Sequence, residues 1–218
     1  MRIIIAGIDT NVGKTFVSSI LTIMLKAEYW KPIQAGNLDN SDSKVVQKLS
    51  GALCHPETYR LRHALSPHKA AALENMPIEE HRICLPKTTA PLIIETAGGF
   101  LSPCSQNQLQ GDFFSSWPCY WLLISKAYLG SINHTCLTVE AMRARNLNIL
   151  GIILNNYPKD EEQWLMQILD LPLLGTLIQE KIITQTTLNH YANIWRPIWK
   201  NIEKTIRGSS GTPLPKLR

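Results

Sequence analysis

The first 25 residues limit the possible folds more than any other part of the chain. Residues 2–6 read as a buried strand that is apolar from Ile3 onward, residues 7–15 form a loop with two glycines, and residues 13–25 place apolar side chains at helical spacing. A buried strand that enters a helix through a glycine loop is the opening unit of many α/β folds. Apolar β-branched runs then alternate with amphipathic stretches along the chain. This alternation predicts a doubly wound, mainly parallel sheet flanked by helices.

The remaining strands and helices are predicted from the same apolar runs and amphipathic stretches. With 218 residues, 44% of them hydrophobic, the chain is long enough for one sizeable core. Neither an internal repeat nor an interdomain linker interrupts the pattern, so residues 1–206 are predicted to form a single domain. Strands are expected at residues 29–33, 91–95, 120–124, 149–154 and 171–177, and helices at residues 41–49, 131–145 and from about residue 184.

The C-terminal segment differs from the rest in composition. Residues 207–218 are rich in Gly, Ser and Pro, and we predict a disordered tail or a remnant left by protein expression. They carry three basic residues and no acidic one, so +2 of the formal charge of +5 remains for residues 1–206. A balance this small gives no reason to expect a nucleic-acid partner.

Three further features concern the compartment. No run of eighteen apolar residues exists, and the short N-terminal apolar stretch enters the glycine loop without a cleavage-type segment. The five cysteines are an odd count without CxxC or CxxH spacing, which argues against a disulfide framework or a metal cluster. We therefore expect a cytoplasmic protein with reduced thiols and no membrane contact.

The glycine loop is typical of phosphate binding. Its backbone N–H groups would point inward, and the helix N-terminus would add partial positive charge. Lys14 would reach the β and γ phosphates, the Thr15 hydroxyl would ligate magnesium, and Gly13 would allow the phosphates to approach closely. The general motif places its first glycine at Ile8, whereas this chain has Gly7 one residue earlier. The alternative is that the Gly-Lys-Thr sequence occurs here by chance and binds no nucleotide. The strand before the loop and the helix after it favour a nucleotide site.

The departure is informative, because Gly-x-Asp-Thr-x-Val-Gly-Lys-Thr resembles the phosphate loop of dethiobiotin synthetases, the BioD family of P-loop NTPases. Related partitioning ATPases carry a lysine where this chain has Asp9, which argues against that branch. The resemblance implies that Thr10 contacts a substrate carbamate. It assigns the nucleotide to Asn11, Val12, Gly13, Lys14, Thr15 and Phe16.

A second motif follows the strand expected at residues 29–33. Lys31-Pro32-Ile33-Gln34-Ala35-Gly36 resembles the family segment Lys-Pro-Val-x-Thr/Ser-Gly, which implies a catalytic Lys31. A lysine at the carboxyl end of a strand would face the same crevice as the phosphate loop. The alternative is a surface lysine at a turn. Ala35 lies on the substrate side in this comparison and lacks the hydroxyl that the family pattern expects.

Two acidic motifs are similar to the family's magnesium ligands. Asn40-Ser41-Asp42 matches an Asn-Ser-Asp segment, and the segment that starts at Glu95 is similar to Glu-Gly-Ala-Gly-Gly. Thr15, Asp42 and Glu95 would together supply the oxygen ligands that magnesium requires. A plain helix cap is the alternative for Asp42. The resemblance also assigns nucleotide contacts to Thr96, which replaces a family glycine, and to Ala97 and Gly98.

Two segments resemble parts of the family that contact the substrate, but they are less specific than the motifs above. Ser66-Pro67-His68 resembles a family segment that lines the substrate, although a turn with a cap is the alternative. Gly130, Ser131, Ile132 and Asn133 open a helix that in the family holds the substrate carboxylate across a dimer interface, and an ordinary helix start is the alternative.

Recognition of the nucleotide base is assigned to a pair of asparagines. Asn155 and Asn156 follow the strand expected at residues 149–154, where the family reads adenine through an amide. The Asn-Lys-x-Asp motif of GTP-binding proteins is absent there. Ile178 replaces an expected proline, so we assign no nucleotide contact beyond Gly175.

The resemblance implies a homodimeric, magnesium-dependent ligase of biotin biosynthesis. Its substrates would be ATP, carbon dioxide or bicarbonate, and 7,8-diaminononanoate, and its products dethiobiotin, ADP and phosphate. Two alternatives remain at this point. One is a partitioning or assembly ATPase that works as a switch, and the other is a degenerate nucleotide-binding module without turnover, motivated by Ala35, Thr96 and Ile178.

Overall fold

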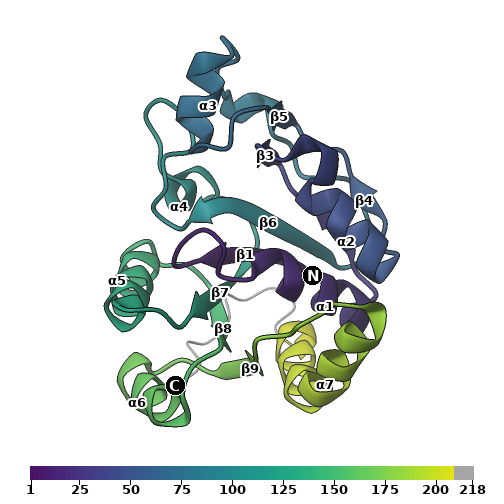
Figure 1. Cartoon of the computed structure of the whole chain (residues 1–218), viewed down its shortest axis with the longest axis vertical. Helices are drawn as coiled ribbons and strands as arrows, with labels where there is room; N and C mark the ends of the chain where they lie inside the picture. Colours follow the sequence, from purple (N-terminus) through teal and green to yellow (C-terminus); the bar gives the residue numbers. More distant parts are fainter. Residues whose placement is uncertain (209–218) are drawn as a thin grey trace.

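The central sheet is parallel throughout and has seven strands. In the computed structural model, which describes residues 1–208, the strand order is β4-β2-β6-β1-β7-β8-β9. The first strand, β1, therefore lies at the centre (Figure 1). The strands are β1 (Arg2–Gly7), β2 (Glu28–Trp30), β4 (Cys54–His55), β6 (Leu92–Gly99), β7 (Tyr120–Lys126), β8 (Ile149–Asn155) and β9 (Leu173–Leu177).

Helices cover both faces of this sheet, as the doubly wound prediction requires. Ile3 and Ile5 of β1 belong to one core, shared with α1 (Lys14–Leu25) and α7 (Gln185–Gly208). The residue between them, Ile4, belongs to the other core, because successive side chains of a strand point to opposite faces. That second core includes residues of α3 (Pro67–Leu73), α4 (Gln110–Phe113), α5 (Ser131–Ala144) and α6 (Lys159–Leu169).

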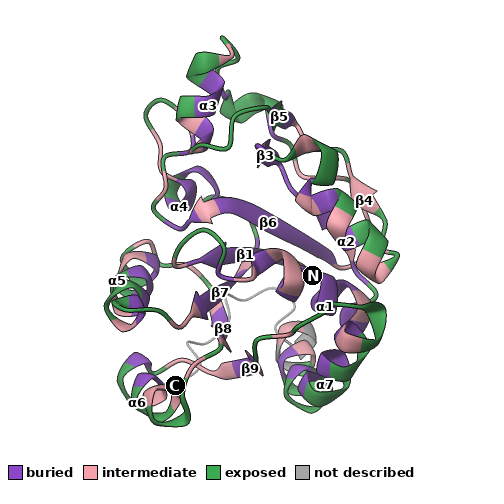
Figure 2. Ribbon diagram, in the orientation of Figure 1, coloured by how far each residue is buried: buried purple, intermediate pink, exposed green. Residues whose placement is uncertain are grey.

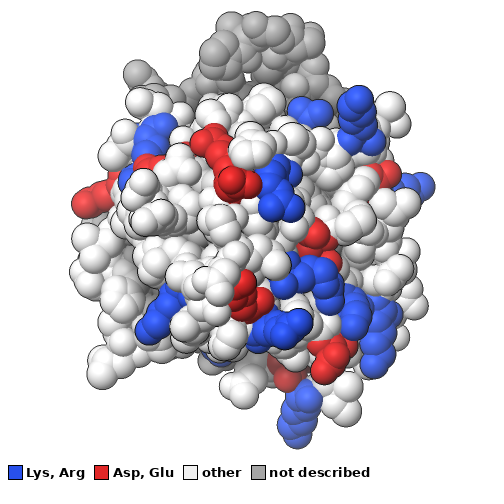
Figure 3. All heavy atoms as spheres, turned by 90° about the horizontal axis from the view of Figure 1, so that it is seen from above, with Lys and Arg blue, Asp and Glu red and all other residues white. Residues whose placement is uncertain are grey.

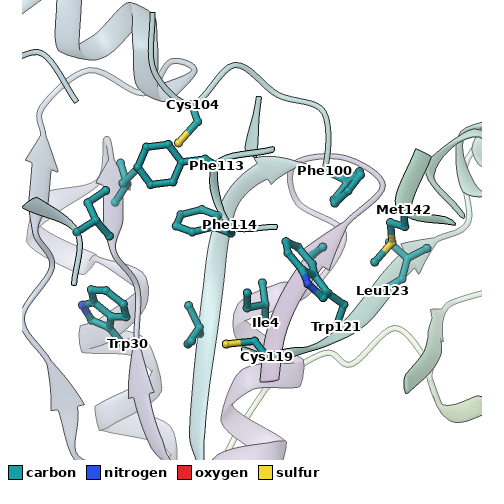
Figure 4. Close-up of a cluster of buried hydrophobic side chains, with 14 of the residues drawn as sticks. Ile4, Trp30, Phe100, Cys104, Phe113, Phe114, Cys119, Trp121, Leu123 and Met142 are labelled. Atoms are coloured by element: carbon teal, nitrogen blue, oxygen red, sulfur yellow. The ribbon is translucent and has the colours of Figure 1, made fainter. Parts of the chain in front are cut away.

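Burial follows the same arrangement. Figure 2 shows the central strands buried and the outer faces of the helices exposed. In the second core, Phe100 packs edge to face on Trp121 with ring centroids 5.6 Å apart, close to the point where β6 ends (Figure 4). Lys, Arg, Asp and Glu side chains are interspersed on the face drawn in Figure 3. Within residues 1–208, no helix is long and apolar enough to cross a membrane.

The strand expected at residues 29–33 is split in two. β2 ends at Trp30, and Ile33–Ala35 (β3) pairs instead with Tyr59–Leu61 (β5) in a separate two-stranded sheet. Pro32 explains the break, because it has no N–H to continue the ladder; its carbonyl accepts hydrogen bonds from Thr58 and Tyr59. The chain thus leaves the main sheet one residue before Lys31.

Other boundaries also differ from the predictions. The strand expected at residues 91–95 runs on to Gly99, because Gly99 still pairs with Gly7 of β1. The helix expected at residues 41–49 is α2 (Asp42–Ser50), capped by Ser41. The prediction omitted α4, α6 and the short 3₁₀ turns at Leu38–Asn40 and Glu80–Arg82. Helix α7 reaches Gly208, and the rest of the predicted tail, residues 209–218, lies outside the described residues.

Candidate active site

The loop between β1 and α1 has the backbone geometry of a phosphate cradle. Gly13 precedes the first residue of α1 with φ = 104°, a left-handed conformation that favours glycine. A Cβ at Gly7 would lie 2.8 Å from the Asp9 carbonyl oxygen and 3.1 Å from Lys14 Nζ. The glycine that stands one residue earlier than in the general motif is therefore required by the close packing of this loop.

Lys14 is held inside the loop. Its Nζ donates to the Asp9 carbonyl at 2.9 Å, and the side chain is almost fully buried. Burial and the positive charge of Lys31 lower the pKa of Lys14 to about 8, against the opposing effect of Glu95 and Asp42. The site therefore holds a cation that the unliganded protein solvates poorly and that a bound anion would stabilise.

Three elements bring the predicted metal ligands together. The Thr15 hydroxyl, on the first turn of α1, lies 3.0 Å from Asp42 Oδ1 and 2.9 Å from Glu95 Oε1. Asp42 opens α2 and Glu95 lies within β6. The cap of α2 is Ser41, whose side chain accepts from the Lys44 N–H, so Asp42 is free to face the cleft. These oxygens are the donor type that magnesium prefers, and their convergence fits that ion.

Lys31 bridges the same carboxylates. Its Nζ lies 2.5 Å from Asp42 Oδ2 and 3.1 Å from Glu95 Oε1, and its side chain is 5% exposed. Burial lowers the pKa of Lys31, but Glu95 and Asp42 outweigh that effect and raise it overall. Lys31 therefore stays charged, and the surface-lysine alternative is wrong for this fold.

The second oxygen of Glu95 has partners that the sequence did not reveal. Ser18 Oγ donates to Glu95 Oε2 at 2.9 Å, and the Tyr29 hydroxyl donates to the same atom at 3.0 Å. Both side chains are fully buried. Their only signal in the sequence is spacing, since Ser18 follows Thr15 by one helical turn and Tyr29 precedes Lys31 by two residues.

The phosphate loop, Lys31 and the carboxylates of Asp42 and Glu95 open onto one cleft of about 720 Å³. Of the predicted site residues, it is lined by Thr10, Asn11, Gly13, Lys14, Thr15, Lys31, Ala35, Asp42, Ser66, Pro67, Glu95, Ala97 and Gly98. The cleft is also lined by residues that the sequence analysis did not single out, namely Gln34, Asn37, Ala64, Leu65 and Ser102.

Five predicted nucleotide residues do not line the cleft, and three of them have side chains that pack elsewhere in the fold. The side chain of Val12 is buried in the core shared with α1 and α7. Phe16 packs edge to face on Tyr191 of α7, with centroids 5.6 Å apart. Thr96 is buried and donates to the Ile5 carbonyl at 3.1 Å. The threonine that replaces the family glycine therefore fits within the sheet, because its hydroxyl donates a hydrogen bond to β1.

The asparagine pair lies beside the loop, outside the lining of the cleft. Asn155 Nδ2 donates to the Val12 carbonyl at 2.9 Å, and a Cβ at Gly13 would lie 2.8 Å from this nitrogen. Asn156 adopts the left-handed conformation with φ = 59°, and its N–H donates to the Leu177 carbonyl. Asn155 therefore joins the end of β8 directly to the phosphate loop.

The two substrate segments differ in position. Ser66 precedes α3 and its Oγ lies 3.0 Å from His68 Nδ1, with no side-chain bond to the helix backbone. Gly130 precedes α5; Ser131 is buried and its Oγ accepts from the Tyr128 N–H, while Asn133 is exposed. Gly130, Ser131, Ile132, Asn133 and His68 do not line the cleft of this chain.

Comparison with known proteins agrees with this geometry. Residues 1–187 match the family model described as an AAA domain. The chain is 66% identical to the ATP-dependent dethiobiotin synthetase of Chlamydia pneumoniae, covering 97% of each chain. It is 65% identical to that of Chlamydia abortus, covering 92% of this chain and 97% of the relative.

A solved structure supports the fold alone. A plasmid partition protein from Borrelia burgdorferi aligns with a TM-score of 0.60 over 92% of this chain and 98% of its own, at 15% identity. At that identity the likeness concerns the architecture of the sheet and helices, and it does not favour the partitioning alternative. The full-length identity of about two thirds decides the matter: the chain belongs to the family of ATP-dependent dethiobiotin synthetases.

Proposed function

We propose that the cleft closes a cyclic urea on 7,8-diaminononanoate, using carbon dioxide and ATP, to give dethiobiotin, ADP and phosphate. The observation that carries this proposal is the position of Lys31. Its Nζ lies within 3.1 Å of two carboxylates, and both Lys31 and Lys14 line one cleft. Two fixed cations around one space suit a transferring phosphoryl group.

The proposed chemistry needs no protein nucleophile. One amine of the substrate adds to carbon dioxide and loses a proton, giving a carbamate. A carbamate oxygen attacks the γ-phosphorus of ATP and ADP leaves; the second amine then attacks the carbamate carbon and phosphate leaves. Lys14 and Lys31 would stabilise the charge on the transferring group, and Thr10 would hold the carbamate. Positioning and electrostatics would supply the catalysis.

Magnesium is part of the proposal. Thr15, Asp42 and Glu95 would hold it, because they present three oxygen donors that meet at one point. Among residues 1–208 no three His, Cys, Asp or Glu side chains gather, so the remaining ligands would be phosphate oxygens and water. Bound there, the ion would neutralise charge on the β and γ phosphates.

The proposal also includes a homodimer. The helix start at residues 130–133 lies away from the cleft of its own chain, and Leu129 beside it is fully exposed. A second copy would cover this apolar surface and would receive the helix start at its own substrate site. Ser66 and Pro67 line the cleft directly and would contact the substrate within the chain. The cytoplasmic location stays a prediction from the sequence.

One experiment separates the candidate functions. ADP release should require both diaminononanoate and bicarbonate, because the γ-phosphate goes to a carbamate. Rapid ATP hydrolysis with neither present would instead identify a switch ATPase. Tight ATP binding without ADP release under any of these conditions would identify a degenerate binding module.

A further inference from the structure

We propose that Tyr29 and Ser18 are positioning residues that fix the orientation of the Glu95 carboxylate toward the metal site. The inference rests on the proposed function, since it takes Glu95 as a magnesium ligand. Neither residue lines the cleft, and neither would touch substrate or nucleotide. Their effect would pass through Glu95 alone.

The hydrogen bonds divide the two oxygens of Glu95 between two tasks. Oε2 accepts from Ser18 Oγ at 2.9 Å and from the Tyr29 hydroxyl at 3.0 Å. Oε1 lies 2.9 Å from Thr15 Oγ1 and 3.1 Å from Lys31 Nζ. With two donors on its far oxygen, the carboxylate plane cannot rotate without breaking a buried hydrogen bond. The near oxygen is thereby held toward Thr15 and Lys31.

The supporting side chains come from the elements that also supply the site. Helix α1 contributes Thr15 to the cleft and Ser18 beneath it, three residues later, on the same face of the helix. β2 contributes Tyr29, and Lys31 follows directly after that strand. A shift of either element would move a cleft residue and its supporting hydroxyl together. The arrangement therefore couples the orientation of Glu95 to the positions of both elements.

Tyr29 is suited to this role because its hydroxyl is enclosed by the protein. Its side chain is fully buried, and the hydroxyl lies 3.0 Å from Glu95 Oε2. A water molecule cannot easily replace it, since the ring packs in the core shared with α1 and α7.

Tyr29→Phe and Ser18→Ala test the inference, since each removes one donor and keeps the remaining shape. Partners that hydrogen-bond a metal ligand typically contribute about 10- to 100-fold to metal affinity or activity. Each variant should therefore lower the affinity for the metal ion about tenfold. We expect the magnesium concentration for half-maximal rate to rise by that factor, while the rate at saturating magnesium changes little. Binding of Mn²⁺ to the ADP complex, measured by electron paramagnetic resonance, should weaken equally without any turnover.

The chain offers a matched control for each variant. Tyr59→Phe removes another buried tyrosine hydroxyl, which accepts from the Glu79 N–H at 2.9 Å. Ser19→Ala removes the neighbouring buried hydroxyl of α1, which donates only to the Thr15 carbonyl. Both controls should keep the parental Mn²⁺ affinity, even where the unfolding temperature falls.

Glu95→Gln distinguishes the two ways to fail. If Glu95→Gln leaves Mn²⁺ binding unchanged, the metal assignment in the proposed function is wrong, and this inference falls with it. If Glu95→Gln weakens Mn²⁺ while Tyr29→Phe and Ser18→Ala behave as their controls do, only the positioning role is overturned. Thermal unfolding shows which variants are folded, and Ser18→Ala decides the outcome should Tyr29→Phe fail to fold.

Discussion

At the scale of single residues, the two lysines of the cleft differ in what holds their charge. Lys31 is paired with two carboxylates, whereas the Nζ of Lys14 donates to a backbone carbonyl. The pKa shifts go in opposite directions for this reason, up for Lys31 and down to about 8 for Lys14. We therefore expect the two lysines to contribute to stability with opposite sign.

Lys14→Met should abolish turnover and yet stabilise the nucleotide-free protein. Because the folded-state pKa of Lys14 is lowered from 10.5 to about 8, its charge costs stability below pH 8, by about 3 kcal/mol. Between pH 8 and 10.5 the unfolded chain binds more protons, so the cost disappears as the pH rises. Urea unfolding should find the variant more stable at pH 7, with the difference gone near pH 10.5. An equal difference at both pH values would contradict the expectation.

Lys31→Ala should behave in the opposite way. It leaves Asp42 and Glu95 without the cation between them, and removing one partner of a buried ion pair costs about 3–5 kcal/mol. Turnover should be lost and the unfolding temperature should fall, with partial recovery when magnesium and ADP are added. Arg82→Ala, which removes an ion pair with Glu79 in which both side chains are about half exposed, is the control that should change stability little.

Ala35 carries a residue-scale prediction about specificity. It lines the cleft, and the family pattern has a hydroxyl at its place. Ala35→Ser should restore a hydrogen bond of about 0.5–1.5 kcal/mol, which is about two- to tenfold in affinity. The KM for diaminononanoate should fall while the KM for ATP stays nearly constant. A change confined to the ATP constant would show that this loop does not face the substrate.

At the scale of elements, the phosphate loop depends on a strand that is distant in sequence. Asn155 at the end of β8 donates to the Val12 carbonyl, so the loop is braced from the side. The same residue is the proposed reader of adenine. The two roles predict different nucleotide profiles.

Asn155→Ala tests these two roles. Loss of the hydrogen bond to the Val12 carbonyl should lower the affinity for every nucleoside triphosphate equally, by about two- to tenfold. Loss of a contact to the base should lower the affinity for ATP and leave the affinities for GTP and CTP unchanged. We expect both components, measured as the dissociation constants of the three nucleotides. Asn148→Ala, at the far end of the β7–β8 connection, is a control that should leave all three constants unchanged.

At the scale of the whole molecule, the prediction concerns the proposed second subunit. If the helix start at residues 130–133 completes the partner's site, Lys14→Ala and Asn133→Trp should each be inactive alone. Mixed and re-equilibrated, they should recover activity, because one site of the mixed dimer has both parts intact. An active monomer in sedimentation at micromolar concentration would exclude the dimer.

The sequence alone determined the phosphate loop, the parallel α/β fold and the family. These rest on local patterns, since a strand, a glycine loop and a helix are adjacent in the chain and their spacing is legible there. The cleft residues Asp42 and Glu95 followed from the resemblance of their motifs to the family. Lys31 followed from the same resemblance and from its place at the carboxyl end of a strand, because such ends meet at one edge of a parallel sheet.

Only the tertiary structure decided which groups contact one another. Pro32 ends the pairing of β2 and sends Ile33–Ala35 into a second sheet, which depends on what β5 offers as a partner. The register of β6 against β1 places Glu95 opposite Ile5, with Ser18 and Tyr29 at its far oxygen. Strand register and side-chain direction depend on contacts between distant residues, such as the Thr96 hydroxyl and the Ile5 carbonyl, which are 91 positions apart, and no local spacing encodes them.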